Sequence, residues 1–397
     1  MATAANPETA AKSDSIRAQM PATLKNAYLN TGTFGPMSTP AIEAMLSYQR
    51  DELEEGRLGP QGYPRAGEAK KGAREAIARL FGANVSNIAL TRHTTDGMNV
   101  GINGLNWQPG EELIITDMEH PGGQVPAYNV ARRYGVVIRL ARLGDGSGDV
   151  VGALESLISP RTRMIVCSHL TWNTGTVLPI AEISEMAHQH HVLTVIDAAQ
   201  GAGSVPINLP ASGVDVYGMP GQKWLCGPEG TGAVYVSDAA LDVIQPTTVG
   251  YASLGGALEH QGGYFLPAHG AARFEVGGSS GPMAEAQKTA VEFMLDTVGA
   301  DWAFERIASL GHYTWEKLSK IDGVSMITPP LKMAGLTCFA IEGVDPADIV
   351  EKLRGRGVLI RSIHGPDCCR VSTGYYNNEE DVDRLASGVE EIARSSR

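Results

Sequence analysis

The run Val192-Leu193-Thr194-Val195-Ile196-Asp197-Ala198-Ala199-Gln200 decides the fold class, and Gly221-Gln222-Lys223-Trp224 follows a short way downstream. An apolar run of this length is typical of a strand buried on both faces, as in parallel sheets covered by helices. An acid at the end of such a strand lies at the carboxyl edge of the sheet, where open α/β folds bind their ligands. Asp197 and Lys223 are therefore the first candidates for a functional site.

Further apolar runs support a parallel sheet. They occur at residues 112–116, 136–140 and 164–167, and helical stretches such as 179–190 alternate with them. Thr39-Pro40 marks a helix start, with apolar residues following at helical spacing. Strands too apolar to be half exposed, separated by helices, predict an α/β domain covered on both faces.

The pattern changes after about Gly281. A long helical stretch through residues 310–318 precedes short strand-like runs at 336–341 and 358–363, and a closing helix is predicted over 379–393. We expect a large α/β domain over 36–281 and a small α+β domain over 282–397, against which residues 21–35 dock. Residues 1–20 are predicted to form a mobile N-terminal arm.

Composition restricts the partners. The chain has 397 residues, 43% of them hydrophobic, and a net charge of −12, which argues against nucleic acid or an anionic membrane as partner. Five cysteines lack the spacing of a metal site or a disulfide framework, and no signal peptide or anchor is evident at the N-terminus. We expect a cytoplasmic protein that binds a small molecule and no metal.

Asp197 and Lys223 together suit one cofactor. A lysine in a glycine-flanked turn can form a Schiff base with the aldehyde of pyridoxal 5'-phosphate (PLP), and a strand-end carboxylate keeps the ring nitrogen of that cofactor protonated. Taken alone, Lys223 could be an ordinary surface lysine and Asp197 an ordinary helix-capping aspartate. Trp224 and Leu225 would supply an apolar wall that lowers the pKa of the lysine.

Thr94 and Thr95 follow an apolar run and open a helix, so their hydroxyls and free backbone N–H groups form a candidate phosphate site. An ordinary threonine helix cap is the alternative. Asp96 would repel a phosphate, and we expect it to point away.

Three more side chains follow predicted strands at the same edge of the sheet. His120 could stack on a flat ring or be a structural histidine, whereas Trp172 and Asn173 could be pocket walls or part of a polar loop with one packed aromatic.

Two arginines lie on strand-like segments near the C-terminus. Arg370 is the candidate for binding a substrate carboxylate, because a guanidinium within an apolar run usually has a bidentate carboxylate partner. Its alternative is an internal salt bridge. Arg361 could serve the same purpose or be exposed at a strand end.

These residues resemble the class V, fold-type I PLP enzymes, because Thr94-Thr95, Glu119-His120, Asp197 to Gln200, Lys223-Trp224 and Arg370 occur in that family's order. The resemblance implies a mostly parallel seven-stranded sheet and a homodimer with shared active sites. It also implies roles: Thr94 and Thr95 on the phosphate, His120 on the ring, Asp197 on the ring nitrogen, Gln200 on the ring hydroxyl, Lys223 as the covalent anchor and Arg370 on the substrate carboxylate.

The chain departs from the family pattern at Pro220, Gln222 and Gly278, where the family commonly has a hydroxyl, an imidazole and a partner-subunit threonine. Either this chain binds the phosphate more weakly than the family does, or Gln222 and Ser279 replace the missing contacts. The loop that carries a nucleophilic cysteine in cysteine desulfurases shrinks to residues 362–369, with Cys368 and Cys369 next to Arg370. The sequence around Arg361 and Arg370 is more similar to the cysteine/cystine C–S lyase and isopenicillin N epimerase-like branch.

The leading hypothesis is β-elimination on a cysteine- or cystine-like substrate, with Lys223 as both anchor and general base. An epimerase, racemase or transaminase is the alternative, for which Tyr217 is a candidate second acid, and a non-catalytic relative is a third. Substrate specificity would come from two loops, Asn30 to Phe34 and Tyr251 to Tyr264. Within the first loop, Asn30 is a candidate substrate contact.

Overall fold

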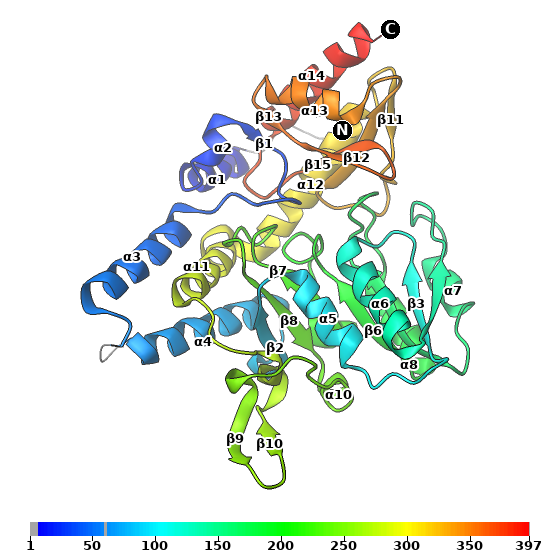
Figure 1. The fold of residues 1–397 in the computed structure, drawn as a ribbon. Helices are drawn as coiled ribbons and strands as arrows, with labels where there is room; N and C mark the ends of the chain where they lie inside the picture. Colours follow the sequence, from blue (N-terminus) through cyan, green and yellow to red (C-terminus); the bar gives the residue numbers. More distant parts are fainter. Residues whose placement is uncertain (1–6, 59–61, 397) are drawn as a thin grey trace.

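A seven-stranded sheet forms the centre of the computed structural model, which describes residues 7–58 and 62–396 (Figure 1). Its strand order is β2-β8-β7-β6-β5-β3-β4. All neighbouring pairs from β7 to β4 are parallel, and β8 is antiparallel to both of its neighbours. The predicted mostly parallel seven-stranded sheet is confirmed. The strands are β2 Ile88–Thr91, β3 Glu112–Thr116, β4 Val137–Ala141, β5 Thr162–Ser168, β6 Leu193–Asp197, β7 Val216–Pro220 and β8 Gly232–Val236.

Helices cover both faces of this sheet, so that apolar side chains pack in two clusters. One cluster receives α5 Thr94–Gly104, α6 Pro121–Tyr134 and α10 Asp238–Leu241. The other receives α4 Gly62–Phe81, α7 Val150–Glu155, α8 Ile180–Gln189 and α9 Leu209–Ser212. β4 differs from the expected fully buried strand: Val137, Arg139 and Leu140 are exposed, because β4 is the sheet's edge.

The predicted helix start at Thr39-Pro40 coincides with α3 Thr39–Glu55, although Ser38 is the residue whose side chain accepts from the helix. The π-helix Phe293–Gly299 follows α11 Gly281–Glu292 directly and leads into α12 Ala300–Leu318. α11 packs along α3 and α4. This long helical connection leads from the large sheet to the C-terminal part of the chain (Figure 1).

A second, four-stranded antiparallel sheet lies in the C-terminal part, in the order β11-β12-β15-β14. Its strands are β11 Val324–Met326, β12 Leu336–Ile341, β14 Arg361–Ile363 and β15 Cys368–Ser372, and α13 Pro346–Arg354 and α14 Glu379–Ser395 pack on it through a third apolar cluster. β1 Ala27–Tyr28 pairs in parallel with β13 Val358–Leu359. Residues 27–28 therefore lie against the C-terminal part of the chain, and the docking of residues 21–35 and the domain boundaries remain predictions.

The N-terminal segment differs from the predicted mobile arm. Residues 7–18 form helix α1 Pro7–Ala18, followed by α2 Ala22–Lys25. Ile16 and Met20 are buried in the main core, and Arg17 forms an ion pair with Asp381 at 2.7 Å. Two apolar anchors and a shielded ion pair hold this helix against the fold. Residues 1–6 of the predicted arm lie outside the described residues.

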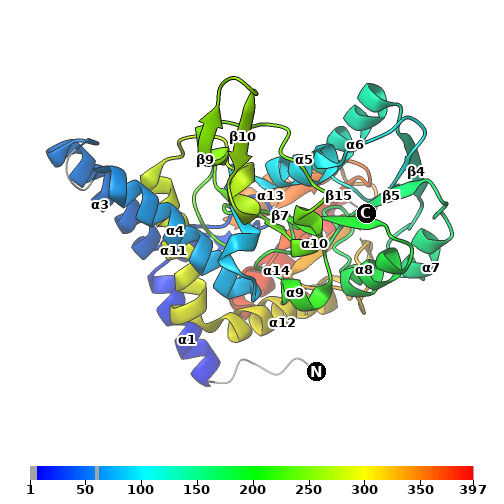
Figure 2. The ribbon, with the colours of Figure 1, turned by 90° about the horizontal axis from the view of Figure 1, so that it is seen from below.

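A hairpin of β9 Leu254–Glu259 and β10 Tyr264–Pro267 projects from the side of the large sheet opposite the C-terminal sheet (Figures 1 and 2). Its exposed apolar side chains include Leu258, Tyr264 and Leu266. Among the described helices, none combines the length and apolar character that a membrane crossing requires.

Candidate active site

Asp197 and Lys223 meet at the carboxyl edge of the large sheet. β6 ends at Asp197, its parallel neighbour β7 ends at Pro220, and Lys223 lies in the turn that follows. The Asp197 carboxylate is buried and accepts a hydrogen bond from the Ala199 N–H at 2.8 Å. Burial raises the pKa of Asp197, while Ala199 and the charge of Lys223 oppose that rise.

Lys223 is half-buried among cations. Desolvation and the positive charges of Arg370 and Arg361 lower the pKa of its amine to about 8, although Asp197 acts in the opposite direction. A neutral amine is the form that attacks an aldehyde or accepts a proton, so this environment increases the reactive fraction near neutral pH.

Glu119 is a second buried carboxylate near Asp197. It accepts hydrogen bonds from the Thr116 hydroxyl at 2.6 Å, the Ser168 N–H at 2.9 Å and the Ser168 hydroxyl at 2.8 Å. Burial and the nearby Asp197 raise the pKa of Glu119 to about 7 despite these bonds. Sequence reasoning used Glu119 only as a family marker, and a strand-end acid beside His120 was the signal available.

Gln200 connects the sheet edge to residues 30–35. Its Nε2 donates to the Gly32 carbonyl at 2.9 Å, and its Oε1 accepts from the Trp224 indole N–H at 3.0 Å. Gly32 leaves room for these contacts, because a Cβ there would approach Gln200 Oε1 and Ser372 Oγ to 2.7 Å and displace both side chains. Both ends of the Gln200 amide are thereby fixed.

Thr94 and Thr95 begin α5, where the helix dipole and free N–H groups favour an anion. His93 caps this helix by accepting from the Asp96 N–H at 3.2 Å. The Asp96 carboxylate accepts from the Arg92 guanidinium at 2.9 and 3.0 Å, which offsets its charge. A cavity of about 530 Å³ lies beside the helix start, and Arg92, Asp96, Asn99, Thr231, Gly278 and Ser279 are among its lining residues, so Asp96 lines this cavity and does not point away from it as expected.

The substrate side is built from Arg370 and its neighbours. Arg370 is 1% exposed and donates to the Trp172 carbonyl at 3.1 Å and to the Thr33 hydroxyl at 3.2 Å. It forms no ion pair with any carboxylate of the described residues, so the predicted alternative of an internal salt bridge is wrong. Desolvation, opposed by nearby cysteine sulfurs and reinforced by Arg361, lowers the pKa of Arg370 to about 10.

His120 lies against Trp172, with ring centroids 5.1 Å apart in an edge-to-face arrangement. Partial removal from water and the charges of Lys223, Arg361 and Arg370 lower the pKa of His120 to about 4. The imidazole is therefore neutral at pH 7. Both rings belong to the same cluster as Lys223 and Arg370, as the sequence predicted from their strand ends.

Several buried polar atoms near this cluster have no partner. They are Trp172 Nε1, Asn173 Oδ1, Gln222 Oε1, Arg370 Nε and Ser372 Oγ. Buried polar groups are normally hydrogen-bonded, so a group of unpaired ones marks the place of a polar ligand. Buried Asp197, the Lys223 amine and the α5 N-terminus supply what a ring nitrogen, an aldehyde and a phosphate require. The residues present fit PLP.

The structure brings the predicted site residues to one region at the sheet edge, with Asn30 alongside them because it bridges to Ser372. Sequence reasoning included Thr33 only as part of the predicted specificity segment from Asn30 to Phe34, and it did not mention Ser372. Tyr217 is an exception: it is fully buried, and its hydroxyl lies 2.8 Å from His169 Nδ1 within the core. A strand position alone did not reveal on which face the Tyr217 ring lies.

The comparisons with known proteins agree with this fold and site. A model of the aminotransferase class-V family matches residues 36–385. The chain is 30% identical to an isopenicillin N epimerase of Amycolatopsis lactamdurans over 389 residues, 92% of this chain and 95% of the relative. It is 27% identical to a probable cysteine desulfurase of Methanothermobacter thermautotrophicus over 404 residues, 96% of this chain and 98% of the relative.

Among solved structures, the cystine C–S lyase C-DES in complex with its reaction product cysteine persulfide superposes with a TM-score of 0.89. The two chains are 30% identical, and the match covers 94% of this chain and 99% of C-DES. Fold and site thus define a PLP-dependent enzyme of fold type I. The chain belongs to the aminotransferase class-V family, and it is related to cysteine desulfurases, C-DES and isopenicillin N epimerases.

Proposed function

We propose that this enzyme is a C–S lyase that catalyses β-elimination on cystine or a cystine-like amino acid with two carboxylates. The observation that carries the proposal is the pair of arginines next to Lys223, Arg361 and Arg370, which form no ion pair with a carboxylate of residues 7–58 and 62–396. Two guanidinium groups at one site suit two carboxylates. The similarity to C-DES, described with cysteine persulfide as its product, supports the same choice.

The reaction balances without a further co-reactant. Cystine and water give pyruvate, ammonia and cysteine persulfide: the Cα–H and Cβ–S bonds break, and the electron pair of the Cα–H bond forms the Cα=Cβ bond of the released enamine. Bound PLP supplies the electron-withdrawing ring that acidifies the Cα–H bond. The departing sulfur takes a proton, and water hydrolyses the enamine.

Each residue has a defined task in this proposal. Lys223 would hold the cofactor, and its free amine would accept the Cα proton. Asp197 would balance the charge on the ring nitrogen, and Thr94, Thr95 and Gln222 would bind the phosphate. Neutral His120 would pack on the ring, Gln200 would contact the ring hydroxyl, and Trp172, Asn173 and Asn30 would border the substrate.

A desulfurase mechanism is disfavoured by burial of the cysteines near the arginines. Cys368 and Cys369 are both 0% exposed on β15. A persulfide-forming cysteine must reach the substrate sulfur as an exposed thiolate. Burial also raises the pKa of Cys369 above its usual range.

The second candidate is an epimerase, and the 30% identity to an isopenicillin N epimerase favours it. Epimerisation needs a second acid on the opposite ring face. Tyr217 does not serve that need, because burial raises the pKa of its hydroxyl far above the usual value and the hydroxyl is bonded to His169.

The decisive experiment is a product assay of the holoenzyme with cystine, cysteine and a panel of α-amino acids in deuterated water. The proposal predicts pyruvate, ammonia and persulfide from cystine. Deuterium at Cα of recovered amino acid without pyruvate would favour the epimerase instead. Alanine formed together with an enzyme persulfide would favour a desulfurase.

We also propose a homodimer. The β9–β10 hairpin and the neighbouring Tyr251 and Val276 present exposed apolar side chains near the cavity beside α5. The resemblance to class V enzymes implies that a residue of a partner subunit reaches the phosphate near the position of Gly278. Light scattering after size exclusion tests this, with a Leu258→Asp, Leu266→Asp variant expected to be monomeric.

A further inference from the structure

Thr33 lies between the two arginines of the substrate side. Its Oγ1 accepts from Arg370 at 3.2 Å and from Arg361 at 3.5 Å, and it donates to Asn30 Oδ1 at 2.8 Å. A hydroxyl has one proton and two lone pairs. Because the Thr33 hydroxyl donates its hydrogen bond to Asn30, both lone pairs remain as acceptors for the guanidinium groups. The neutral Thr33 oxygen therefore accepts a hydrogen bond from each of the two cations.

The arginines depend on Thr33 to different degrees. Arg370 is buried and has a second acceptor in the Trp172 carbonyl. Arg361 is exposed, and among the residues that the structure describes its guanidinium donates to Thr33. Loss of the Thr33 hydroxyl would leave Arg370 in place and release Arg361 to the solvent.

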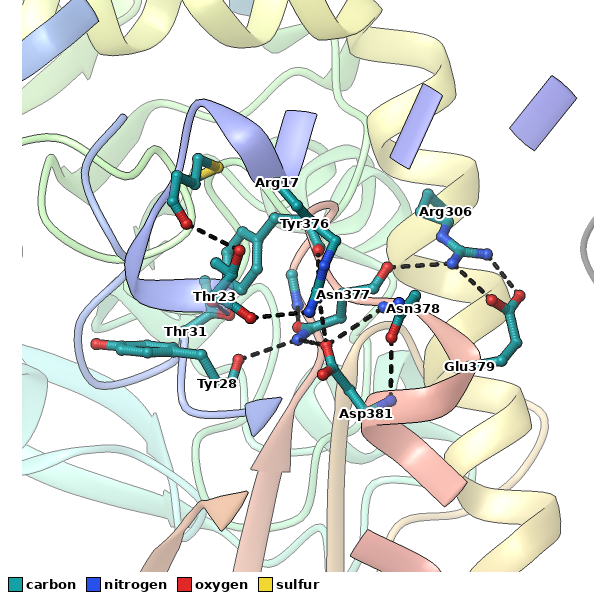
Figure 3. A network of polar contacts seen from close by, with 12 residues as sticks. Arg17, Thr23, Tyr28, Thr31, Arg306, Tyr376, Asn377, Asn378, Glu379 and Asp381 are labelled. Carbon is teal, nitrogen blue, oxygen red and sulfur yellow. Dashed lines mark hydrogen bonds and ion pairs between the residues drawn. The ribbon is translucent and has the colours of Figure 1, made fainter. Parts of the chain in front are cut away.

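The segment that carries Thr33 is held firmly on its other side (Figure 3). Thr31 Oγ1 lies 2.6 Å from the Tyr376 hydroxyl and donates to the Ser372 carbonyl at 3.1 Å. Asn377 donates to the Tyr28 carbonyl at 3.2 Å and to the Asp381 carboxylate at 2.8 Å, and Arg17 completes this network. The Thr33 oxygen is thus positioned before any ligand arrives.

We propose that Thr33 is a specificity-determining residue, whose hydroxyl holds Arg361 beside Arg370 so that the site selects ligands with two carboxylates over ligands with one. The inference deepens the proposed lyase function, and it rests on that function for the identity of the substrate. The charge arrangement itself predicts dicarboxylate binding whether or not the enzyme eliminates sulfur. Arg370 would bind the first carboxylate and Arg361 the second.

The test uses two unreactive ligands and the holoenzyme. Isothermal titration calorimetry compares glutarate, with two carboxylates, and butyrate, with one, for the wild type and for Thr33→Val, which keeps the shape and removes the hydroxyl. We expect the Kd of glutarate to rise about tenfold in Thr33→Val and that of butyrate to change less than about twofold. Thr33→Ser should retain the wild-type preference.

Two controls separate specificity from damage to the fold. Thr31→Val removes a hydroxyl two residues away that touches neither arginine. It should lower the melting temperature without altering the ratio of the glutarate Kd to the butyrate Kd. Arg361→Met should raise the ratio of the glutarate Kd to the butyrate Kd, as Thr33→Val does. The double variant Thr33→Val, Arg361→Met should add little beyond either single change, because both act on one interaction.

Turnover supplies an independent readout. In Thr33→Val, KM for cystine should rise about tenfold with kcat little changed, whereas KM for β-chloroalanine, which has one carboxylate, should stay near the wild-type value. Equal effects of Thr33→Val on both ligand classes would overturn the proposal. An enzyme without lyase activity but with a Thr33-dependent glutarate preference would refute the proposed function and leave the specificity role intact.

Discussion

Asp197 and Lys223 lie close enough that each charge opposes the effect of burial on the other. Burial raises the pKa of Asp197 while Lys223 lowers it, and burial lowers the pKa of Lys223 while Asp197 raises it. As a result, a cationic neighbour stabilises the ionised form of Asp197, and the Lys223 amine is partly neutral near pH 8. A protonated ring nitrogen and an aldehyde satisfy both needs.

The lowered pKa of Lys223 predicts how the cofactor-free protein takes up PLP. The initial rate of covalent attachment, followed by absorbance, should rise with pH through about 8 and then level off, because the neutral amine is the nucleophile. In Arg370→Met the midpoint should move to higher pH, since one of the charges that lower this pKa is gone. A midpoint near the ordinary 10.5 in the wild type would contradict this account of the site.

Glu119 predicts a pH dependence of stability for the cofactor-free protein. Its pKa in the fold is about 7 against an ordinary 4.5, so between these values the folded state binds more protons than the unfolded state. The free energy of unfolding should therefore fall as pH rises through this window. Glu119→Gln should remove up to about 3 kcal/mol of that decline, measured by calorimetry from pH 4 to 8. The exposed Glu229→Gln is the control, and equal profiles for both variants would count against the buried acid.

Arg370→Met should separate binding from stability. A buried cation without a carboxylate partner costs desolvation free energy, so the variant should unfold at the same or a higher temperature. KM for cystine should nonetheless rise roughly a hundredfold, the loss expected for a charge-assisted carboxylate contact. An exposed Arg142→Met variant should change neither quantity. A destabilised Arg370→Met protein with unchanged KM would assign this arginine to the fold.

Arg17→Met tests the anchoring of the N-terminal helix. The Arg17–Asp381 pair is shielded, with side chains 11% and 7% exposed, and its loss leaves Asp381 buried beside Asn377. We expect the free energy of unfolding to drop by about 3 kcal/mol in urea titrations. Arg354→Met removes an exposed pair with Glu351 and should cost less than about 0.5 kcal/mol. Similar values for the two variants would mean that α1 adds little to stability.

The large sheet could be predicted because its central strands are continuous apolar runs, and β12 Leu336–Ile341 has the very bounds that the sequence indicated. Side chains at strand ends, such as Asp197 and His120, could be predicted for the same reason. Within the predicted specificity segment from Asn30 to Phe34, Thr33 could not be singled out, because its contacts form only where this segment lies beside Ser372 at the end of β15. The helix α1 was missed because the apolar residues that anchor it, Ile16 and Met20, are few and their partners are distant in sequence.

The central claim is that Lys223 carries the cofactor. Incubation of the purified protein with PLP, reduction with borohydride, proteolysis and mass spectrometry will locate the attachment. We predict one phosphopyridoxyl group per chain, on the peptide that contains Gly221-Gln222-Lys223-Trp224, and none in Lys223→Ala. Stoichiometric labelling of another lysine in the wild type, or no labelling at all, would contradict the account.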